Sequence, residues 1–227
     1  MSNAQTYEDW GSFAQEWRNT YLAFTRQLAN DPSIRYKTVD QHHLDALYDL
    51  LSDHTLILCS PDSPDRPLSG SLFPSSVIET LSLTWHQLTP WPDTNPGLSL
   101  LNKNFATCTL TNGNLSLIRD MASSGSMPFT HLFSAELFDS YKPNPKVYLG
   151  AAEKLGFKPE ECAMVAAHLG DLEAAMKCGF RTVYVERPLE ERDEELKVRM
   201  EGVVDVWIKG GEEGFVEVAR RLGVESA

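Results

Sequence analysis

Two stretches of this chain decide its fold. Residues Tyr141–Tyr148 read YKPNPKVY, and residues Met164–Leu172 read MVAAHLGDL. With the earlier Thr111-Asn112-Gly113, they place a lysine, an aspartate and an amide where strand-like runs give way to helical ones. Open α/β sheets place their chemistry at such junctions. The stretches therefore predict a functional site on an α/β core.

The second half of the chain alternates between strand-like and helix-like runs. We expect strands at 105–110, 131–134, 162–167, 182–185 and after 204, and helices at 115–121, 145–155, 172–178 and up to 222. Strands that alternate with helices predict a parallel sheet with right-handed crossovers. Gly156 and Gly179 follow apolar helical runs, where a left-handed C-terminal cap favours glycine.

The first half of the chain reads as helical. Apolar residues recur at three- and four-residue steps from Phe13 to Leu28, which predicts an amphipathic helix. Two more helices are expected at 39–51 and 75–88, and the Pro, Ser and Gly content of residues 60–72 predicts an exposed loop insertion. We therefore expect a helical region over 1–89 and an α/β core over 90–227.

Composition limits the classes of partner. The chain has 227 residues, 42% of them hydrophobic, with 32 acidic against 20 basic side chains and a net charge of -12. This charge disfavours nucleic acid and anionic membrane surfaces. The four cysteines show no CxxC spacing, and the polar amino terminus lacks the pattern of a secretory signal. We expect a cytoplasmic protein with free thiols and no membrane span.

Taken together, these motifs resemble the haloacid dehalogenase superfamily, and within it the type II L-2-haloacid dehalogenase-like branch. The resemblance rests on Trp17-Arg18, Trp91-Pro92-Asp93, Thr111-Asn112-Gly113, Tyr141-Lys142-Pro143 with Tyr148, and the turn from His168 to Asp171. It implies a Rossmann-like core with an α-helical cap. It also implies a small-molecule acid substrate and metal-free hydrolysis without a cofactor. A homodimer formed through the cap is compatible with it.

The resemblance also implies roles for individual residues. A core aspartate of the family displaces halide from carbon 2 of a haloacid, and water then cleaves the ester. Lys142 would keep that carboxylate ionised, and Asp171 would orient Lys142 and the water. Substrate contacts would come from a further set of side chains: Arg18, Thr111, Asn112, Tyr148 and His168.

Structural interpretations of the same residues stay open. Thr111-Asn112-Gly113 is also a common turn sequence, and Asp171 also suits the first turn of a helix as a cap. A phosphatase of the same superfamily needs a magnesium ion held partly by an acid pair four residues apart. The residue four before Asp171 is Ala167, which cannot ligate a cation, so the sequence favours the dehalogenase interpretation.

One expected element is missing from the sequence. The family's first strand ends in Asp-x-x-Gly-Thr and should precede Arg18 by some tens of residues, between the strands that end at Thr111 and Ala167. The Glu8–Ser12 segment imitates the motif without an apolar strand before it. Residues 55–59, followed by Asp62, are a weak candidate for a substitute strand.

The missing strand leads to three hypotheses. The chain is a truncated form of a longer enzyme, a degenerate relative with a binding or scaffold role, or a protein that is stable only with help. In the first two, the site lacks its nucleophile and the chain by itself is inactive. The loss should also leave two unpaired strand edges inside the sheet.

Overall fold

The computed structural model describes residues 7–31, 33–53, 57–60, 63–71 and 73–224. The chain divides into two compact units, Met1–His86 and Gln87–Ala227, called unit 1 and unit 2. Each unit has hydrophobic clusters of its own. None of the described helices is long and apolar enough to cross a membrane.

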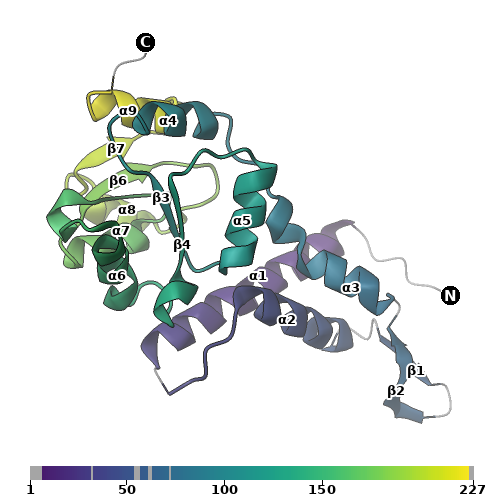
Figure 1. The fold of residues 1–227 in the computed structure, drawn as a ribbon. Helices are drawn as coiled ribbons and strands as arrows, with labels where there is room; N and C mark the ends of the chain where they lie inside the picture. Colours follow the sequence, from purple (N-terminus) through teal and green to yellow (C-terminus); the bar gives the residue numbers. More distant parts are fainter. Residues whose placement is uncertain (1–6, 32, 54–56, 61–62, 72, 225–227) are drawn as a thin grey trace. The chain divides into compact units, whose positions relative to one another are not determined.

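Unit 1 is mainly helical (Figure 1). It contains α1 (Tyr7–Asn30), α2 (Val39–Asp53) and α3 (Ser75–Ser82), which is followed by the 3-10 turn η1 (Thr84–Gln87). The apolar faces meet in one cluster, which includes Phe13 of α1, Leu47 of α2 and Ile78 of α3. The predicted amphipathic first helix is confirmed. The predicted third helix is shorter, because it ends at Ser82 and the chain continues as η1.

Residues 60–72, predicted as a loop, belong largely to a β-hairpin. β1 (Ile57–Ser60) pairs antiparallel with β2 (Ser63–Ser71) in a two-stranded sheet. Proline is tolerated in such a ribbon because each strand has an unpaired edge, so composition alone misidentified the segment. Of the candidate substitute strand, Thr55, Leu56 and Asp62 lie outside the described residues. Its described part pairs with β2.

Unit 2 is an α/β body with parallel strands. β3 (Cys108–Thr111) pairs with β4 (His131–Ser134). A second sheet has the order β5 (Ala163–Ala166), β6 (Arg181–Val185) and β7 (Val206–Ile208). The predicted α/β class is confirmed. Among the described strands, none pairs with the second edge of β3 or of β5, as expected for a core that lacks a strand between them.

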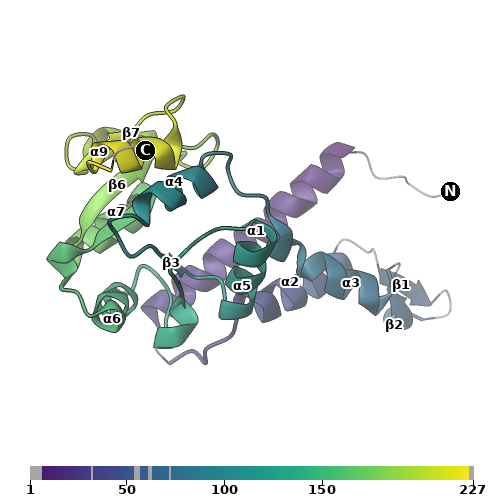
Figure 2. The same ribbon diagram turned by 45° about the horizontal axis from the view of Figure 1, so that its top comes forward.

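Helices surround these strands (Figures 1 and 2). They are α4 (Thr94–Leu101), α5 (Leu115–Ser124), α6 (Pro145–Leu155), α7 (Leu169–Lys177), α8 (Glu194–Met200) and α9 (Gly214–Arg221), with 3-10 turns η2 (Ala135–Phe138) and η3 (Pro159–Glu161). The sequence analysis did not predict α4, which contains Pro96 and Gly97, two residues that disfavour a helix interior. Gly156 and Gly179 have φ of +76° and +90°, which confirms the predicted left-handed positions.

Alternate residues of β6 face two different clusters. Tyr184 packs in one cluster with Leu172 of α7 and Met200 of α8. Val183 packs in the other, which includes residues of α4 and α9. These two helices lie side by side (Figures 1 and 2), and a Cβ at Gly97 of α4 would overlap Phe215 of α9. The sheet is therefore covered on both faces, as parallel sheets require.

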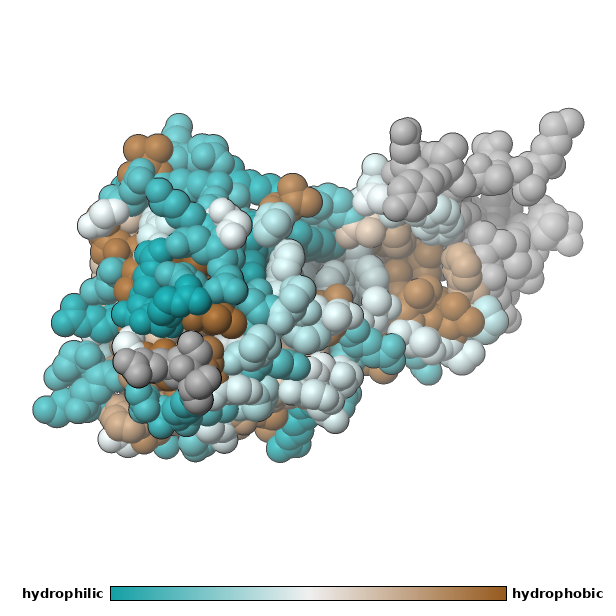
Figure 3. All heavy atoms as spheres, turned by 90° about the horizontal axis from the view of Figure 1, so that it is seen from above, coloured by the Kyte–Doolittle hydropathy of each residue, from teal (hydrophilic) through white to brown (hydrophobic). Residues whose placement is uncertain are grey.

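The outer surface on the α4 and α9 side is mainly hydrophilic, with hydrophobic residues in scattered groups (Figure 3). On α9, Arg220 pairs with Glu213 at 2.7 Å, and Arg221 pairs with Glu217 at 2.9 Å. These pairs occupy the solvent side of the helix, while Val218 is fully buried against the sheet.

Candidate active site

The predicted site residues of unit 2 gather at the carboxyl ends of β3 and β5. Asn112 directly follows β3, and Asp171 lies in the first turn of α7, which follows β5. Lys142 lies in the loop between η2 and α6 and forms hydrogen bonds with both Asn112 and Asp171. Three segments far apart in the sequence therefore meet at one edge of the core, where α/β proteins place their chemistry.

Asp171 is the centre of this group. Its Oδ2 accepts a hydrogen bond from Lys142 Nζ at 2.5 Å, and its Oδ1 accepts one from the Tyr148 hydroxyl at 2.5 Å. The Lys142 and Asp171 side chains are 14% and 17% exposed, so the ion pair is largely shielded from water. The N-cap residue of α7 is His168, and Asp171 lies in the first turn with both carboxylate oxygens bonded to Lys142 and Tyr148. These partners favour a role in the site over the capping interpretation left open by the sequence.

Tyr148 is fully buried, so it acts on Asp171 rather than on solvent. Burial raises the pKa of its hydroxyl well above the ordinary value, and the negative charge of Asp171 and the hydrogen bond to it raise the pKa further. The phenol therefore stays protonated and works as a fixed donor. Tyr148 was predicted as a substrate contact, and in the structure its hydroxyl donates to Asp171.

Asn112 holds the Lys142 backbone through two hydrogen bonds. Its Nδ2 donates to the Lys142 carbonyl at 3.2 Å, and its Oδ1 accepts from the Lys142 N–H at 2.7 Å. The amide thus matches a peptide group and fixes the starting point of the lysine side chain. Both polar atoms of Asn112, predicted to bind substrate, already have partners within the chain, although Nδ2 carries a second hydrogen.

The amino terminus of α5, which follows the Thr111-Asn112-Gly113 turn, already contacts a carboxylate. Glu136 Oε2 accepts a hydrogen bond from the Leu115 N–H at 2.7 Å. The Thr111 hydroxyl accepts one from the Gly113 N–H at 3.1 Å, which closes the turn. A carboxylate at this end of a helix is favourable. Sequence reasoning missed Glu136; its position two residues after the end of β4 is the only available signal.

α7 begins in a similar way. Glu191 Oε2 accepts a hydrogen bond from the Leu169 N–H at 2.9 Å. His168, predicted as a substrate contact, has an exposed side chain whose Nε2 lies 3.2 Å from Glu190 Oε2. The acidic run 190–195 therefore supplies two partners to the start of α7, in addition to beginning α8.

Arg18, the remaining predicted site residue, is half-buried on α1 of unit 1, beside Trp17. Trp17 Nε1 donates to the His43 carbonyl at 3.0 Å, which ties α1 to α2. Burial, followed by the charge of the neighbouring His42, lowers the pKa of His43 to about 4. This histidine is therefore neutral near pH 7.

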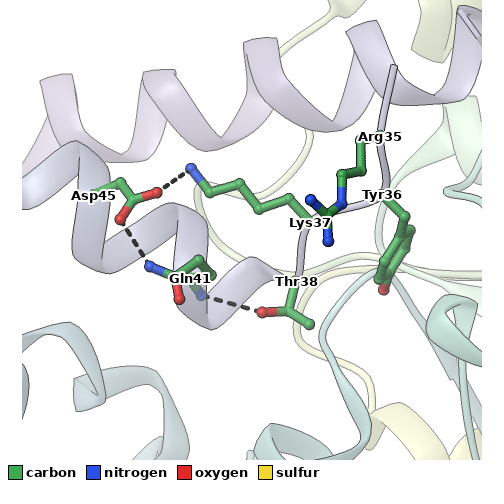
Figure 4. Close-up of a pocket in the computed structure, with 6 residues that line it drawn as sticks. All are labelled: Arg35, Tyr36, Lys37, Thr38, Gln41 and Asp45. Carbon is green, nitrogen blue, oxygen red and sulfur yellow. Dashed lines mark hydrogen bonds and ion pairs between the residues drawn. The ribbon is translucent and has the colours of Figure 1, made fainter. Parts of the chain in front are cut away.

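A cavity of about 510 Å³ lies elsewhere in unit 1, between the start of α2 and the segment before it (Figure 4). Lys37 Nζ pairs with Asp45 Oδ2 at 2.5 Å, and the Gln41 side chain donates to Asp45 Oδ1 at 2.8 Å. Its central charges thus neutralise each other. None of the predicted site residues lines this cavity.

The geometry of unit 2 provides a positioned cation and a positioned carboxylate. The ammonium of Lys142 carries three hydrogens, and Asp171 accepts one of them. Within the part of the chain that the structure describes, Asp171 is the only carboxylate that pairs with Lys142. An additional carboxylate or other anion at Lys142 would find a shielded positive charge.

Comparison with known proteins identifies the family. A family model described as haloacid dehalogenase-like hydrolase matches residues 14–179. The chain belongs to the haloacid dehalogenase-like hydrolases. The matched range includes the Asn112, Lys142 and Asp171 group, and the type II dehalogenase-like resemblance stated from the motifs is confirmed.

Several dehalogenases are similar to this chain. The (S)-2-haloacid dehalogenase 1 of Pseudomonas sp. (strain CBS-3) is 31% identical over 121 residues, which is 52% of this chain and 53% of that protein. The chain thus spans about half the length of the curated relatives that it matches. The crystal structure of the L-2-haloacid dehalogenase PA0810 has a TM-score of 0.75 and 28% identity, and the match covers 94% of this chain and 84% of that one.

A phosphatase is also among the similar proteins. The glyceraldehyde 3-phosphate phosphatase of Methanopyrus kandleri is 31% identical over 122 residues, covering 51% of this chain and 52% of that protein. Relatives named for both chemistries therefore match this chain at similar identity, and the side chains of the site must distinguish them.

Proposed function

We propose that the Lys142 and Asp171 group is a haloacid dehalogenase-type site that takes a small 2-haloacid, and that the chain by itself does not turn it over. The observation that carries this proposal is the shielded ion pair, in which Asp171 fixes Lys142 and both are held by neighbours. In the reaction proposed for the complete site, a carboxylate attacks carbon 2, the halide leaves with the bonding electrons, and water cleaves the resulting ester.

In this proposal Lys142 stabilises the attacking carboxylate, and Asp171 orients Lys142 and the hydrolytic water. Thr111, Asn112 and His168 line the approach to the substrate, and Arg18 of the helical cap clamps its carboxylate or halide. Tyr148 serves as a positioning residue for Asp171. The described residues near Lys142 offer no second carboxylate to attack, which is why we propose that the isolated chain is inactive.

The phosphatase alternative has less support in the site. Both oxygens of Asp171 already accept hydrogen bonds from Lys142 and Tyr148, and position 167 is alanine. Among the described residues, no group of three His, Cys, Asp or Glu side chains is arranged to hold a metal ion. A purely binding role remains the main alternative to a hydrolase that lacks one part.

The proposal is tested with (S)-2-chloropropionate and the purified chain. We expect binding in a ligand-observed NMR titration and no chloride release above the protein-free rate. Lys142→Ala should weaken binding about tenfold or more, because a charged hydrogen bond contributes roughly 1.5–3 kcal/mol. The matched control, Lys146→Ala, removes an exposed lysine in the first turn of α6 and should leave binding unchanged.

Two results would contradict the proposal. Chloride release that Lys142→Ala abolishes would show that the isolated chain is active. Equal affinity of the Lys142→Ala and Lys146→Ala variants for (S)-2-chloropropionate would show that Lys142 does not form the binding site. Hydrolysis of p-nitrophenyl phosphate that requires added Mg²⁺ would favour the phosphatase alternative.

A further inference from the structure

The turn that carries Asn112 is held from the neighbouring strand. Residues 112–114 join β3 to α5, and among the described strands β4 is the one that pairs with β3. In this pairing Thr111 lies opposite Ser134, the last residue of β4. The segment that follows Ser134 therefore leaves the sheet beside the turn, at the edge where the site is assembled.

Ser134 fixes the middle of this turn. The residue is fully buried, and its hydroxyl donates to the Gly113 carbonyl at 2.5 Å. The same oxygen accepts a hydrogen bond from the Glu136 N–H at 3.1 Å. A serine hydroxyl has one hydrogen, and here Gly113 accepts it. The contact therefore ties the turn to the end of β4 at a place closed to water.

Glu136 fixes the far end of the same turn. Its Oε2 accepts a hydrogen bond from the N–H of Leu115, the first residue of α5, at 2.7 Å. The first N–H groups of a helix have no partner within the helix, so a carboxylate there satisfies one of them and complements the positive end of the helix. Ser134 and Glu136, two residues apart, thus hold the turn at two points.

Asn112 directly precedes the held part of the turn and transmits its position to Lys142. The Asn112 side chain makes two hydrogen bonds with the Lys142 backbone, and Lys142 Nζ reaches Asp171. Two hydrogen bonds between an amide and a backbone require both groups to lie in matching positions, because each bond weakens steeply when its angle changes. The position of the ammonium therefore depends on a series of contacts that begins at Ser134 and Glu136.

We propose that Ser134 and Glu136 are positioning residues of the site, which hold the turn so that Asn112 places Lys142. The inference deepens the proposed function, and it rests on it for the role of Lys142 in receiving the substrate. The alternative is a local role, in which Ser134 caps η2 and Glu136 stabilises the start of α5 without effect on Lys142.

NMR of the full chain without substrate separates these roles. The signals to follow are those of the Lys142 N–H and of the Asn112 side-chain amide. In Glu136→Ala both should shift, and the Lys142 N–H should exchange with solvent severalfold faster, because its hydrogen bond to Asn112 is loosened. Glu136→Gln keeps an oxygen that can accept from Leu115, so both signals should stay close to those of the unchanged chain.

Matched variants locate the effect. Ser134→Ala removes the contact with the Gly113 carbonyl and should shift the same two signals. Glu153→Ala on α6 and Ser123→Ala on α5 change exposed residues and should leave them in place. Circular dichroism establishes that each variant is folded. Should Glu136→Ala fail to fold, Glu136→Asp takes its place, because the shorter side chain moves the carboxylate away from Leu115 and keeps its charge.

Affinity for (S)-2-chloropropionate is the second measurement. Ser134→Ala and Glu136→Ala should each weaken binding about two- to tenfold, the effect of one hydrogen bond, and less than Lys142→Ala does. Glu136→Gln should recover most of the affinity. A local role would lower stability in urea without this difference between the alanine and glutamine variants in binding.

The two measurements distinguish the outcomes. Folded Ser134→Ala and Glu136→Ala variants with unchanged Lys142 and Asn112 signals would overturn the positioning role. Shifted signals in a chain that does not bind 2-chloropropionate would support that role and count against the proposed function. Equal binding of 2-chloropropionate by the unchanged chain and both alanine variants would support the proposed function and overturn the positioning role.

Discussion

β6 and the pair β3 and β5 are strands of one α/β unit, but their surroundings differ. β6 has a parallel neighbour on each side and is buried from Thr182 to Val185. β3 and β5 each have one described neighbour and remain partly exposed, although Lys142 joins their carboxyl ends through Asn112 and Asp171. The difference teaches that the site can be assembled by side chains while the sheet beneath it is incomplete.

The largest expected effect lies on the well-paired side. Arg187, just after β6, makes two hydrogen bonds to Asp93 at 2.7 and 2.6 Å, and the Phe215 N–H donates to the same carboxylate at 2.8 Å. Burial alone would raise the pKa of Asp93, but these bonds hold it below its ordinary value. Arg187→Ala should cost about 3–5 kcal/mol of unfolding free energy, because it leaves a buried charge unpaired.

Urea denaturation measures this loss. The double variant Arg187→Met with Asp93→Leu is the control, and it should be more stable than Arg187→Ala because neither charge remains. If Arg187→Ala lowered the unfolding free energy by less than about 1 kcal/mol, the Arg187 and Asp93 pair would not stabilise the β6 side as described.

The second prediction concerns the amino ends of β3 and β5, the two strands that each have one described neighbour. Burial, followed by the charge of the nearby Cys162, raises the pKa of the Cys108 thiol, at the start of β3, to about 11. The thiolate is the reactive form, so alkylation of Cys108 should be slow at pH 8. Its rate should rise about tenfold per pH unit up to about pH 10.5, since each unit below the pKa reduces the thiolate tenfold.

Iodoacetamide labelling followed by peptide mass spectrometry measures this rate, and Cys108→Ser identifies the signal. Rapid labelling at pH 7 would show that the unpaired edge of β3 is open to water along its whole length. Slow labelling would sharpen the comparison, because it would limit the open part to the carboxyl end beside Lys142.

The smallest expected effect comes from the same substitution on two strands. Val183 of β6 is 2% exposed, whereas Val165 of β5 is half-buried. Val183→Ala should cost about 2 kcal/mol of unfolding free energy, from lost burial and a cavity, and Val165→Ala about 1 kcal/mol or less. Equal losses of unfolding free energy in Val183→Ala and Val165→Ala, measured by thermal or urea unfolding, would contradict the difference between the two strands.

Much of the fold could be predicted from sequence because its signals are local. The alternation of runs gave the strands of unit 2, and the glycines at 156 and 179 gave two helix ends. The hairpin at residues 57–71 could not be predicted, since its pairing overrides a loop-like composition. α4 was not predicted, because its sequence contains Pro96 and Gly97. In the structure Gly97 lets α4 pack closely on Phe215.

The site was predicted in part. Motif spacing placed Lys142, Asp171 and Asn112 at strand ends, and the structure brings these three together. Sequence could not show that the Tyr148 hydroxyl donates to Asp171, or that Glu136 and Glu191 contact the starts of α5 and α7. Those contacts depend on how loops return to the core, which no local pattern encodes.

Residue-resolved amide hydrogen exchange of the free chain by NMR tests the central claim most directly. Amides of β6 should exchange slowest. Amides on the unpaired edges of β3 and β5 should exchange at least about a hundredfold faster. That result would show two unpaired edges beneath an assembled Lys142 and Asp171 site. Equal protection of β3, β5 and β6 in a monomeric chain would contradict the account.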